Sequence, residues 1–284
     1  MGHLDSNPFA GFKKQKDYLI CVDSDGCAMD TMDIKHFKCF GPCMVREWGL
    51  ESWKKDILDQ WNKVNLYSMT RGINRFKALA LVLEWVDSLY CQIPGIQELA
   101  AWTREADELS NSALERQMRS CPSICLKKAL DWSGTVNREI SHLPKADMKP
   151  FPGVKEGIML AHQYADIAVV SSANPDAVAD EWGRHGLLAD VDILLAQDAG
   201  SKSYCIGKLL EYGYENDHVM MVGDAPGDCQ AAGMNSVHFY PILVNREYES
   251  WMTIMKSVKR LVDGTFTQEW QKQLRDGFEM NLKA

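Results

Sequence analysis

The chain has 284 residues, of which 46% are hydrophobic and 25% charged, and its formal net charge is −8. Its length suits one large domain or two smaller ones, and its composition is that of an ordinary globular protein. The acidic balance argues against nucleic acid or an anionic membrane as a bulk partner, because polyanions attract basic surfaces. No apolar stretch reaches membrane-spanning length, so we expect no membrane partner.

The nine cysteines are odd in number and scattered along the chain, which argues against a disulfide framework. We interpret them as reduced, buried thiols. This usage predicts a protein of the cytoplasm, where thiols stay reduced.

Five short apolar runs are typical of strands buried in a parallel sheet. They span residues 18–22, 166–170, 191–195, 218–222 and 237–241. Helical segments at 177–185, 202–212 and 229–232 separate the last four runs and end before Gly186, Gly213 and Gly233, each suited to a left-handed cap. This alternation predicts a doubly wound α/β fold with helices on both faces of the sheet.

The region between the first and second runs has a different character. Tryptophans and charges recur there at helical spacing, and residues 78–86 and 99–109 form clear helical patterns. We therefore predict an all-helical domain at 34–149, inserted into an α/β core made of residues 1–33 and 150–284. The stretch 247–284 also has a helical pattern, and it either completes the core or forms a contact in a homodimer.

Polar residues follow four of these segments in a fixed order. Two aspartates, Asp23 and Asp25, follow the first apolar run and precede Gly26. The later segments carry Ser171-Ser172-Ala-Asn174, then Gly200-Ser-Lys202, then Gly223-Asp224-Ala-Pro-Gly-Asp228. The ligand crevice of an open α/β sheet lies outside the carboxyl ends of its strands, where these residues are predicted to meet.

These four motifs resemble those of the haloacid dehalogenase (HAD) superfamily, over roughly residues 17–33 and 148–245. The resemblance implies a Rossmann-like core with a helical cap inserted after the first motif, as in phosphoglycolate phosphatase and β-phosphoglucomutase. It also implies Mg²⁺ as cofactor and a small phosphorylated metabolite as substrate.

Phosphoryl transfer explains the paired aspartates chemically. Asp23 would attack phosphorus and form an aspartyl phosphate. Asp25 would protonate the leaving oxygen and then deprotonate water. Since a phosphate monoester is dianionic, a magnesium ion held by carboxylates would cancel the repulsion. We predict Asp23, Asp224, Asp228 and, through its backbone carbonyl as the resemblance implies, Asp25 as its ligands. Asp228 has an alternative as a helix N-cap.

The transferring phosphoryl group also needs donors. Ser171 is the preferred hydroxyl, with Ser172 as its rival and Asn174 as a further substrate contact. Lys202 would bind both the phosphate and Asp23, although Lys208 is a second candidate. Ser203 follows Lys202 where family members often have proline.

Within the helical insertion, Arg71, Asn74 and Arg75 are predicted to contact the substrate's leaving group, because guanidinium groups suit carboxylates and phosphates. The alternative is that Arg71 caps a helix and that Arg75 pairs with surface acids. The leading function is a magnesium-dependent phosphatase. A sugar-phosphate mutase that uses the same aspartate, and a non-catalytic HAD-fold binding protein, are the alternatives.

Overall fold

The structure is a computed structural model that describes residues 7–283. The chain forms two compact units, one combining the residues up to Thr31 with those from Ala146 onward, and the other spanning Met32–Lys145. The first unit holds a parallel sheet and the second is helical. The sequence analysis placed the two boundaries after residue 33 and before residue 150, in each case a few positions further along the chain than the structure does.

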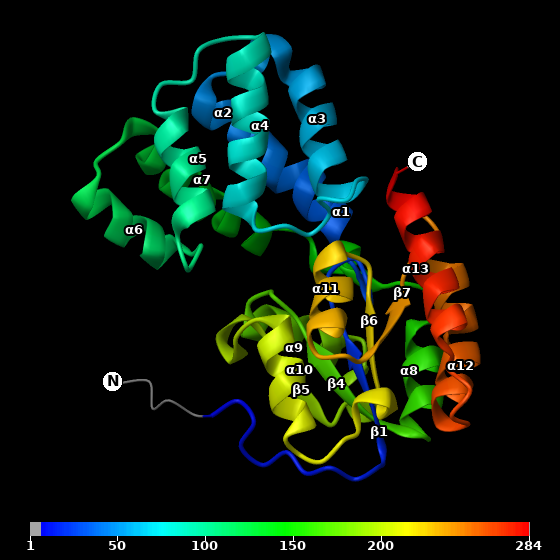
Figure 1. Ribbon diagram of the computed structural model, residues 1–284. Helices are drawn as coiled ribbons and strands as arrows, with labels where there is room; N and C mark the ends of the chain where they lie inside the picture. The colour runs from blue at the N-terminus through cyan, green and yellow to red at the C-terminus, as the bar shows by residue number, and fades with distance from the viewer. Residues whose placement is uncertain (1–6, 284) are drawn as a thin grey trace. The chain divides into compact units, whose positions relative to one another are not determined.

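A five-stranded parallel sheet forms the centre of the first unit (Figure 1), with the order β5-β4-β1-β6-β7. The strands are β1 (Tyr18–Val22), β4 (Ala165–Val170), β5 (Ile193–Leu195), β6 (Val219–Gly223) and β7 (His238–Pro241). Each matches a predicted apolar run to within two residues at either end. This confirms the α/β fold class, because strands buried on both faces are continuously apolar.

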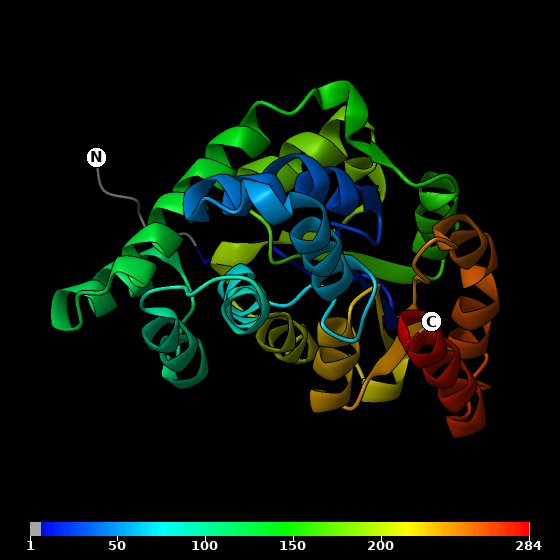
Figure 2. The same ribbon diagram turned by 90° about the horizontal axis from the view of Figure 1, so that it is seen from above.

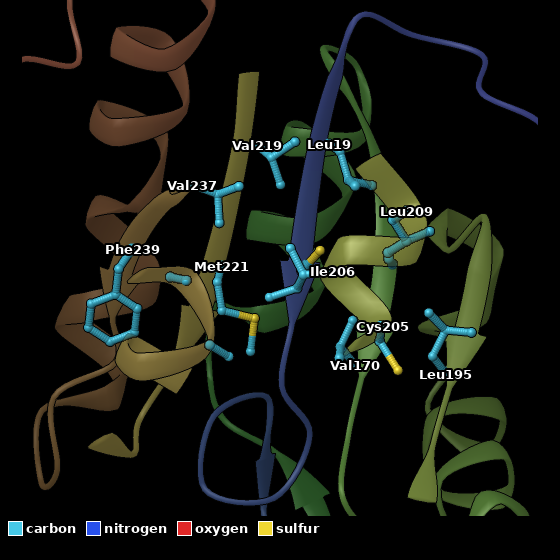
Figure 3. Packing of buried hydrophobic residues seen from close by; sticks show 14 of the residues in the cluster. Leu19, Val170, Leu195, Cys205, Ile206, Leu209, Val219, Met221, Val237 and Phe239 are labelled. Atoms are coloured by element: carbon cyan, nitrogen blue, oxygen red, sulfur yellow. The ribbon is translucent and has the colours of Figure 1, made fainter. Parts of the chain in front are cut away.

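Helices cover both faces of this sheet (Figures 1 and 2). One face packs against α8 (Val154–His162), α9 (Pro175–Arg184) and α12 (Glu247–Val262). The other packs against α10 (Lys202–Leu210), α11 (Pro226–Met234) and α13 (Gln268–Lys283). Side chains alternate along each strand, so Leu19 and Cys21 face the second group of helices, as Figure 3 shows for Leu19, while Ile20 and Val22 face the first.

The C-terminal helices complete the core, one on each face of the sheet. Trp251 and Ile254 of α12 are buried in the cluster beneath α8 and α9. Phe278 and Leu282 of α13 are buried beside Phe239 in the opposite cluster. This resolves one of the two roles left open for residues 247–284. A contact in a homodimer stays a prediction.

The helix ends follow the glycine signals at two positions and depart from them at a third. Gly186 and Gly213 have φ values of 66° and 91°, as predicted for left-handed caps after α9 and α10. The prediction for Gly233 is wrong. Helix α11 continues through it to Met234, and Ser236 takes the left-handed conformation instead, with φ of 55°.

The second unit contains helices and, among its described residues, no strand. Two of its tryptophans, Trp61 and Trp132, are fully buried and meet edge to face with ring centroids 5.8 Å apart. Its helices are α1 (Met32–Lys35), a π-helical turn at His36–Phe40, α2 (Gly41–Trp48), α3 (Lys54–Leu66), α4 (Arg75–Leu89), α5 (Ile96–Glu105), α6 (Asn111–Ser120) and α7 (Ile124–Ser141).

A two-stranded ribbon lies in the first unit where the chain leaves it and returns. Here β2 (Met29–Asp30) pairs antiparallel with β3 (Lys149–Pro150). Across residues 7–283, no helix combines the length and the apolar character needed to traverse a lipid bilayer.

Candidate active site

Three polar segments begin at the same edge of the sheet. Strand β1 lies between β4 and β6, and Val22 at its end is in register with Val169 and Val222. Because the strands are parallel, their carboxyl ends meet there. The residues that follow β1, β4 and β6 are Asp23, Ser171 and Asp224. The sheet therefore brings the first, second and fourth motifs to one edge.

A cluster of three buried carboxylates occupies this edge. Asp23, Asp224 and Asp228 each place a carboxylate oxygen within 4.8 Å of the other two. The three residues are 5%, 1% and 0% exposed, respectively. Buried carboxylates at such separations are costly unless a cation or a proton compensates them. The arrangement thus has the form of a cation site.

Lys202 supplies one positive charge to this cluster. Its Nζ lies 2.9 Å from Asp23 Oδ2 and 2.5 Å from Asp228 Oδ1. Lys202 is the first residue of α10, and the Ser201 side chain caps that helix by accepting from Tyr204 N–H at 3.2 Å. Lys208, the other candidate lysine, instead pairs with Glu211 on the exposed side of the same helix.

The charge balance fits a divalent cation. Burial raises the pKa of Asp23 well above its usual value; Lys202 opposes this shift, while the Asp228 and Asp224 carboxylates add to it. Three carboxylates lie together here, and Lys202 contacts two of them, Asp23 and Asp228. Carboxylate oxygen is also the ligand type that Mg²⁺ prefers. A Mg²⁺ ion held by Asp23, Asp224 and Asp228 would therefore keep Asp23 ionised.

Local backbone geometry explains how Asp228 reaches this cluster. It lies in the first turn of α11, where its Oδ2 accepts the Ala225 N–H at 3.0 Å while Oδ1 meets Lys202. A Cβ at Gly223 would collide with the Asp228 side chain, so position 223 requires glycine. The alternative that Asp228 is the N-cap is wrong, because Ala225 holds that position; Asp228 is the third residue of α11, and its side chain accepts the N–H of the N-cap residue.

The loop that follows Asp23 is tightly hydrogen-bonded. The Ser24 carbonyl accepts the N–H groups of Cys27, Ala28 and Met29 at 3.3, 3.0 and 2.8 Å. Gly26 makes the turn possible with φ of 80°. The loop therefore holds Asp23 and Asp25 in one fixed segment.

Asp25 has a partner that the sequence analysis missed. The buried Thr31 hydroxyl donates to Asp25 Oδ1 at 2.5 Å. This hydrogen bond fixes the orientation of the Asp25 carboxyl group. Thr31 lies six residues after Asp25, and no spacing rule predicts a contact across such an irregular turn. The metal contact predicted for the Asp25 backbone carbonyl stays a prediction.

The two serines of the second motif differ in burial. Ser171 is 3% exposed, donates its N–H to Leu195 O at 2.9 Å, and accepts the Ala173 N–H on its Oγ at 3.1 Å. Ser172 is exposed. Asn174 caps α9 by accepting the Ala177 N–H at 3.2 Å. Their predicted phosphate and substrate contacts stay predictions.

The three residues predicted to recognise the leaving group lie in the helical unit. Arg71 is buried and donates from Nη1 to the carbonyl of Leu66, the last residue of α3, at 2.7 Å. Asn74 caps α4 by accepting the Phe76 N–H at 2.9 Å. These contacts match the helix-capping alternative for Arg71. They leave substrate contact by Arg71 and Asn74 untested.

Arg75 packs inside the same unit. Its guanidinium lies 5.0 Å from the Phe40 ring centroid and donates from Nη1 to Asn137 Oδ1 at 2.7 Å and to Ser133 Oγ at 3.2 Å. Burial lowers the pKa of Arg75 to about 10. Arg75 thus contacts neutral groups and an aromatic ring, not the surface acids of the alternative interpretation. Its substrate contact also stays a prediction.

Comparison with known proteins gives the chain a family. The model of the haloacid dehalogenase-like hydrolases matches residues 98–241, about half of the chain. This range includes Ser171, Lys202, Asp224 and Asp228, and it begins after Asp23 and Asp25. A comparison with curated proteins found no match.

Solved structures share the fold at low sequence identity. A haloacid dehalogenase-like family hydrolase from Xanthomonas campestris has a TM-score of 0.50 at 11% identity, over 90% of this chain and 98% of that one. A presumed phosphoglycolate phosphatase from Lactobacillus delbrueckii subsp. bulgaricus has a TM-score of 0.50 at 13% identity, over 80% and 86%. At such identities the likeness establishes fold and not substrate. With the family match, the sheet order and the four motifs at its edge, the chain belongs to the haloacid dehalogenase-like hydrolase family.

Proposed function

We propose that the chain is a magnesium-dependent phosphatase that hydrolyses a small phosphorylated metabolite through an aspartyl phosphate on Asp23. The observation that carries the proposal is the ion pair of Lys202 with Asp23 inside the cluster of buried carboxylates. It supplies a nucleophile, a fixed positive charge and a cation site at one sheet edge. When bound, Mg²⁺ would supply electrostatic stabilisation of the phosphoryl oxygens.

In the first half-reaction, an oxygen of Asp23 attacks phosphorus and the bond to the leaving oxygen breaks. Protonated Asp25 gives its proton to that oxygen, so the alcohol departs neutral. Lys202 and the Ser171 hydroxyl bind the phosphoryl oxygens during transfer. The products are the alcohol and a phosphorylated Asp23.

In the second half-reaction, Asp25 takes a proton from a water molecule that attacks the aspartyl phosphate. Inorganic phosphate leaves, and the Asp23 carboxylate is restored. The Thr31 hydroxyl, 2.5 Å from Asp25 Oδ1, keeps this carboxyl in place through both proton transfers. In the helical unit, Arg71, Asn74 and Arg75 are proposed to select the leaving group.

The test is phosphate release from a panel of phosphorylated metabolites, with Mg²⁺ or with a chelator. Asp23→Asn should remove release while the fold persists. Asp17→Asn is the matched control, because Asp17 precedes β1 at the opposite edge of the sheet and its side chain is 84% exposed. Activity that survives in Asp23→Asn would overturn the nucleophile assignment. Phosphoryl exchange between sugar phosphates without net release would favour a mutase instead.

A further inference from the structure

A hydrogen bond between two fully buried side chains joins the loop after β1 to helix α9. The indole Nε1 of Trp182 donates to the Ser24 hydroxyl at 2.9 Å, and both residues are 0% exposed. Water has no access to either group, so the loss of one partner leaves the other unsatisfied. The hydrogen-bonded arrangement of Trp182 and Ser24 is therefore the favourable one.

Ser24 has a special position in the chain. It stands between Asp23 and Asp25, and its carbonyl is the acceptor on which the following loop is built. A displacement of Ser24 would move both neighbouring carboxylates, because they share its two peptide bonds. The hydrogen bond to Trp182 thus acts on the backbone that carries the nucleophile and the acid–base group.

Trp182 connects this backbone to the second motif. It lies in α9, which begins at Pro175, four residues after Ser171. The Asn174 side chain caps that helix, and Ser171 holds the intervening turn through its bond to Ala173 N–H. One buried contact therefore links the segment of Asp23 to the segment of Ser171.

We propose that Trp182 and Ser24 are positioning residues for phosphoryl transfer, which hold the Asp23–Asp25 segment in register with the Ser171 segment. The proposal rests on the proposed phosphatase function. A reacting group displaced by about 1 Å can lose roughly a hundredfold in rate. Trp182 and Ser24 touch no reacting atom in this scheme and act through Asp23 and Asp25.

The chain contains a matched control for this contact. Trp270 Nε1 donates to the Ser257 hydroxyl at 3.1 Å, between α13 and α12. This second pair makes the same kind of bond inside the same unit, away from the loop that carries the aspartates. Trp270 is only partly buried, so this pair controls for the effect of removing an indole–hydroxyl bond on kcat and not for the size of the loss in Tm.

The experiment compares Ser24→Ala, Trp182→Phe and their double variant with Ser257→Ala, Trp270→Phe and their double variant. All are assayed for Mg²⁺-dependent hydrolysis and for Tm. We expect the first set to lower kcat by roughly ten- to a hundredfold with KM changed by less than about twofold, and the control set to keep kcat. Each double variant removes both polar partners, so its loss of Tm should be smaller than the sum of the losses in the two single variants.

The double variant Ser24→Ala/Trp182→Phe separates positioning from stability. Its kcat should be as low as in the single variants although its loss of Tm is less than additive, because the hydrogen bond to α9 is still absent. If kcat of the double variant exceeds that of both single variants, or if the control set loses kcat equally, the inference is overturned.

A second measurement does not depend on turnover. Beryllofluoride has the tetrahedral shape of a phosphoryl group and bonds to a carboxylate oxygen, so its binding with Mg²⁺ can be followed by ¹⁹F NMR. Ser24→Ala and Trp182→Phe should weaken this binding, and the control pair should not. An inactive wild type with that binding pattern would overturn the proposed function and support the inference. An active wild type whose Ser24 and Trp182 variants keep kcat and binding would support the proposed function and overturn the inference. A wild type that neither hydrolyses phosphate esters nor binds beryllofluoride would overturn both proposals.

Discussion

Replacement of Lys202 by methionine should destabilise the metal-free protein more than the same replacement of an exposed lysine. The ammonium lies between Asp23 and Asp228 at 2.9 and 2.5 Å, and its side chain is 16% exposed. Burial alone would lower the pKa of Lys202, but the two carboxylates raise it above its ordinary value, so the charge is retained. Methionine keeps most of the volume and removes the charge.

The expected magnitude follows from leaving buried carboxylates without their ammonium. Breaking a buried ion pair by removing one partner costs about 3–5 kcal/mol in the free energy of unfolding. A cation that binds the folded site should offset part of this loss, by about 2.7 kcal/mol when Mg²⁺ is present at a hundred times its Kd. We therefore expect Lys202→Met to be strongly destabilised in a chelator and partly rescued by Mg²⁺.

Urea unfolding followed by circular dichroism, in chelator and in Mg²⁺, measures both effects. Lys208→Met is the matched control, because Lys208 pairs with Glu211 at the surface and its replacement should change stability little. Lys202→Met should also lower kcat by roughly a hundred- to a thousandfold, as removal of a transition-state donor does. A Lys202→Met protein as stable in chelator as Lys208→Met would refute the electrostatic reasoning.

Two further predictions concern Asp25 and the pH dependence of folding. Thr31→Val should slow hydrolysis of alkyl phosphates more than that of p-nitrophenyl phosphate, because the p-nitrophenolate leaving group needs little protonation. Thr31→Ser should restore the rate. Equal losses on both esters would contradict this prediction. Burial lowers the pKa of His238 from 6.5, so its neutral form stabilises the fold above pH 6.5 and that contribution is lost as pH falls through the lowered folded pKa. The Tm of the wild type should therefore fall more steeply than that of His238→Phe between about pH 7 and pH 5; parallel curves would refute the assignment.

The sheet was predictable because its strands are buried on both faces. A run such as Tyr18–Val22 has no polar position to interrupt it, and its abrupt end at Asp23 marks the sheet edge. Helix ends were less predictable. Gly233 carries the residue-type signal of a cap, but Asn235, two residues later, donates from Nδ2 to Ala231 O and Ser203 O. Such contacts let α11 run on to Met234.

The candidate site divides in the same way. Asp23, Asp224 and Asp228 were predictable because each follows a strand or opens a helix, and the parallel sheet then brings them together. The bonds from Thr31 to Asp25 and from Trp182 to Ser24 were not. The first depends on the path of an irregular loop, and the second joins residues 158 positions apart. Neither has a periodicity or a spacing that sequence reasoning can detect.

Arg71 shows why the substrate contacts were the weakest part of the sequence analysis. A guanidinium group suits an anionic ligand, but it also suits the unpaired carbonyls at the end of a helix. In the structure the Arg71 guanidinium donates to the carbonyl of Leu66 at the end of α3. Residue type alone favours neither use, because both offer oxygen acceptors to the same planar donor.

The local charge balance, and not the overall charge of −8, determines what this site can accept. Three carboxylates lie together in this cluster, and carboxylates repel a dianionic ester. A divalent cation would add positive charge to the cluster, beside the ammonium of Lys202, which lies 2.9 Å from Asp23. Substrate affinity should therefore depend on the cation even for variants that cannot turn over. An acidic chain can in this way bind an anion, because the charged groups that act on the anion lie within a few ångströms of Asp23.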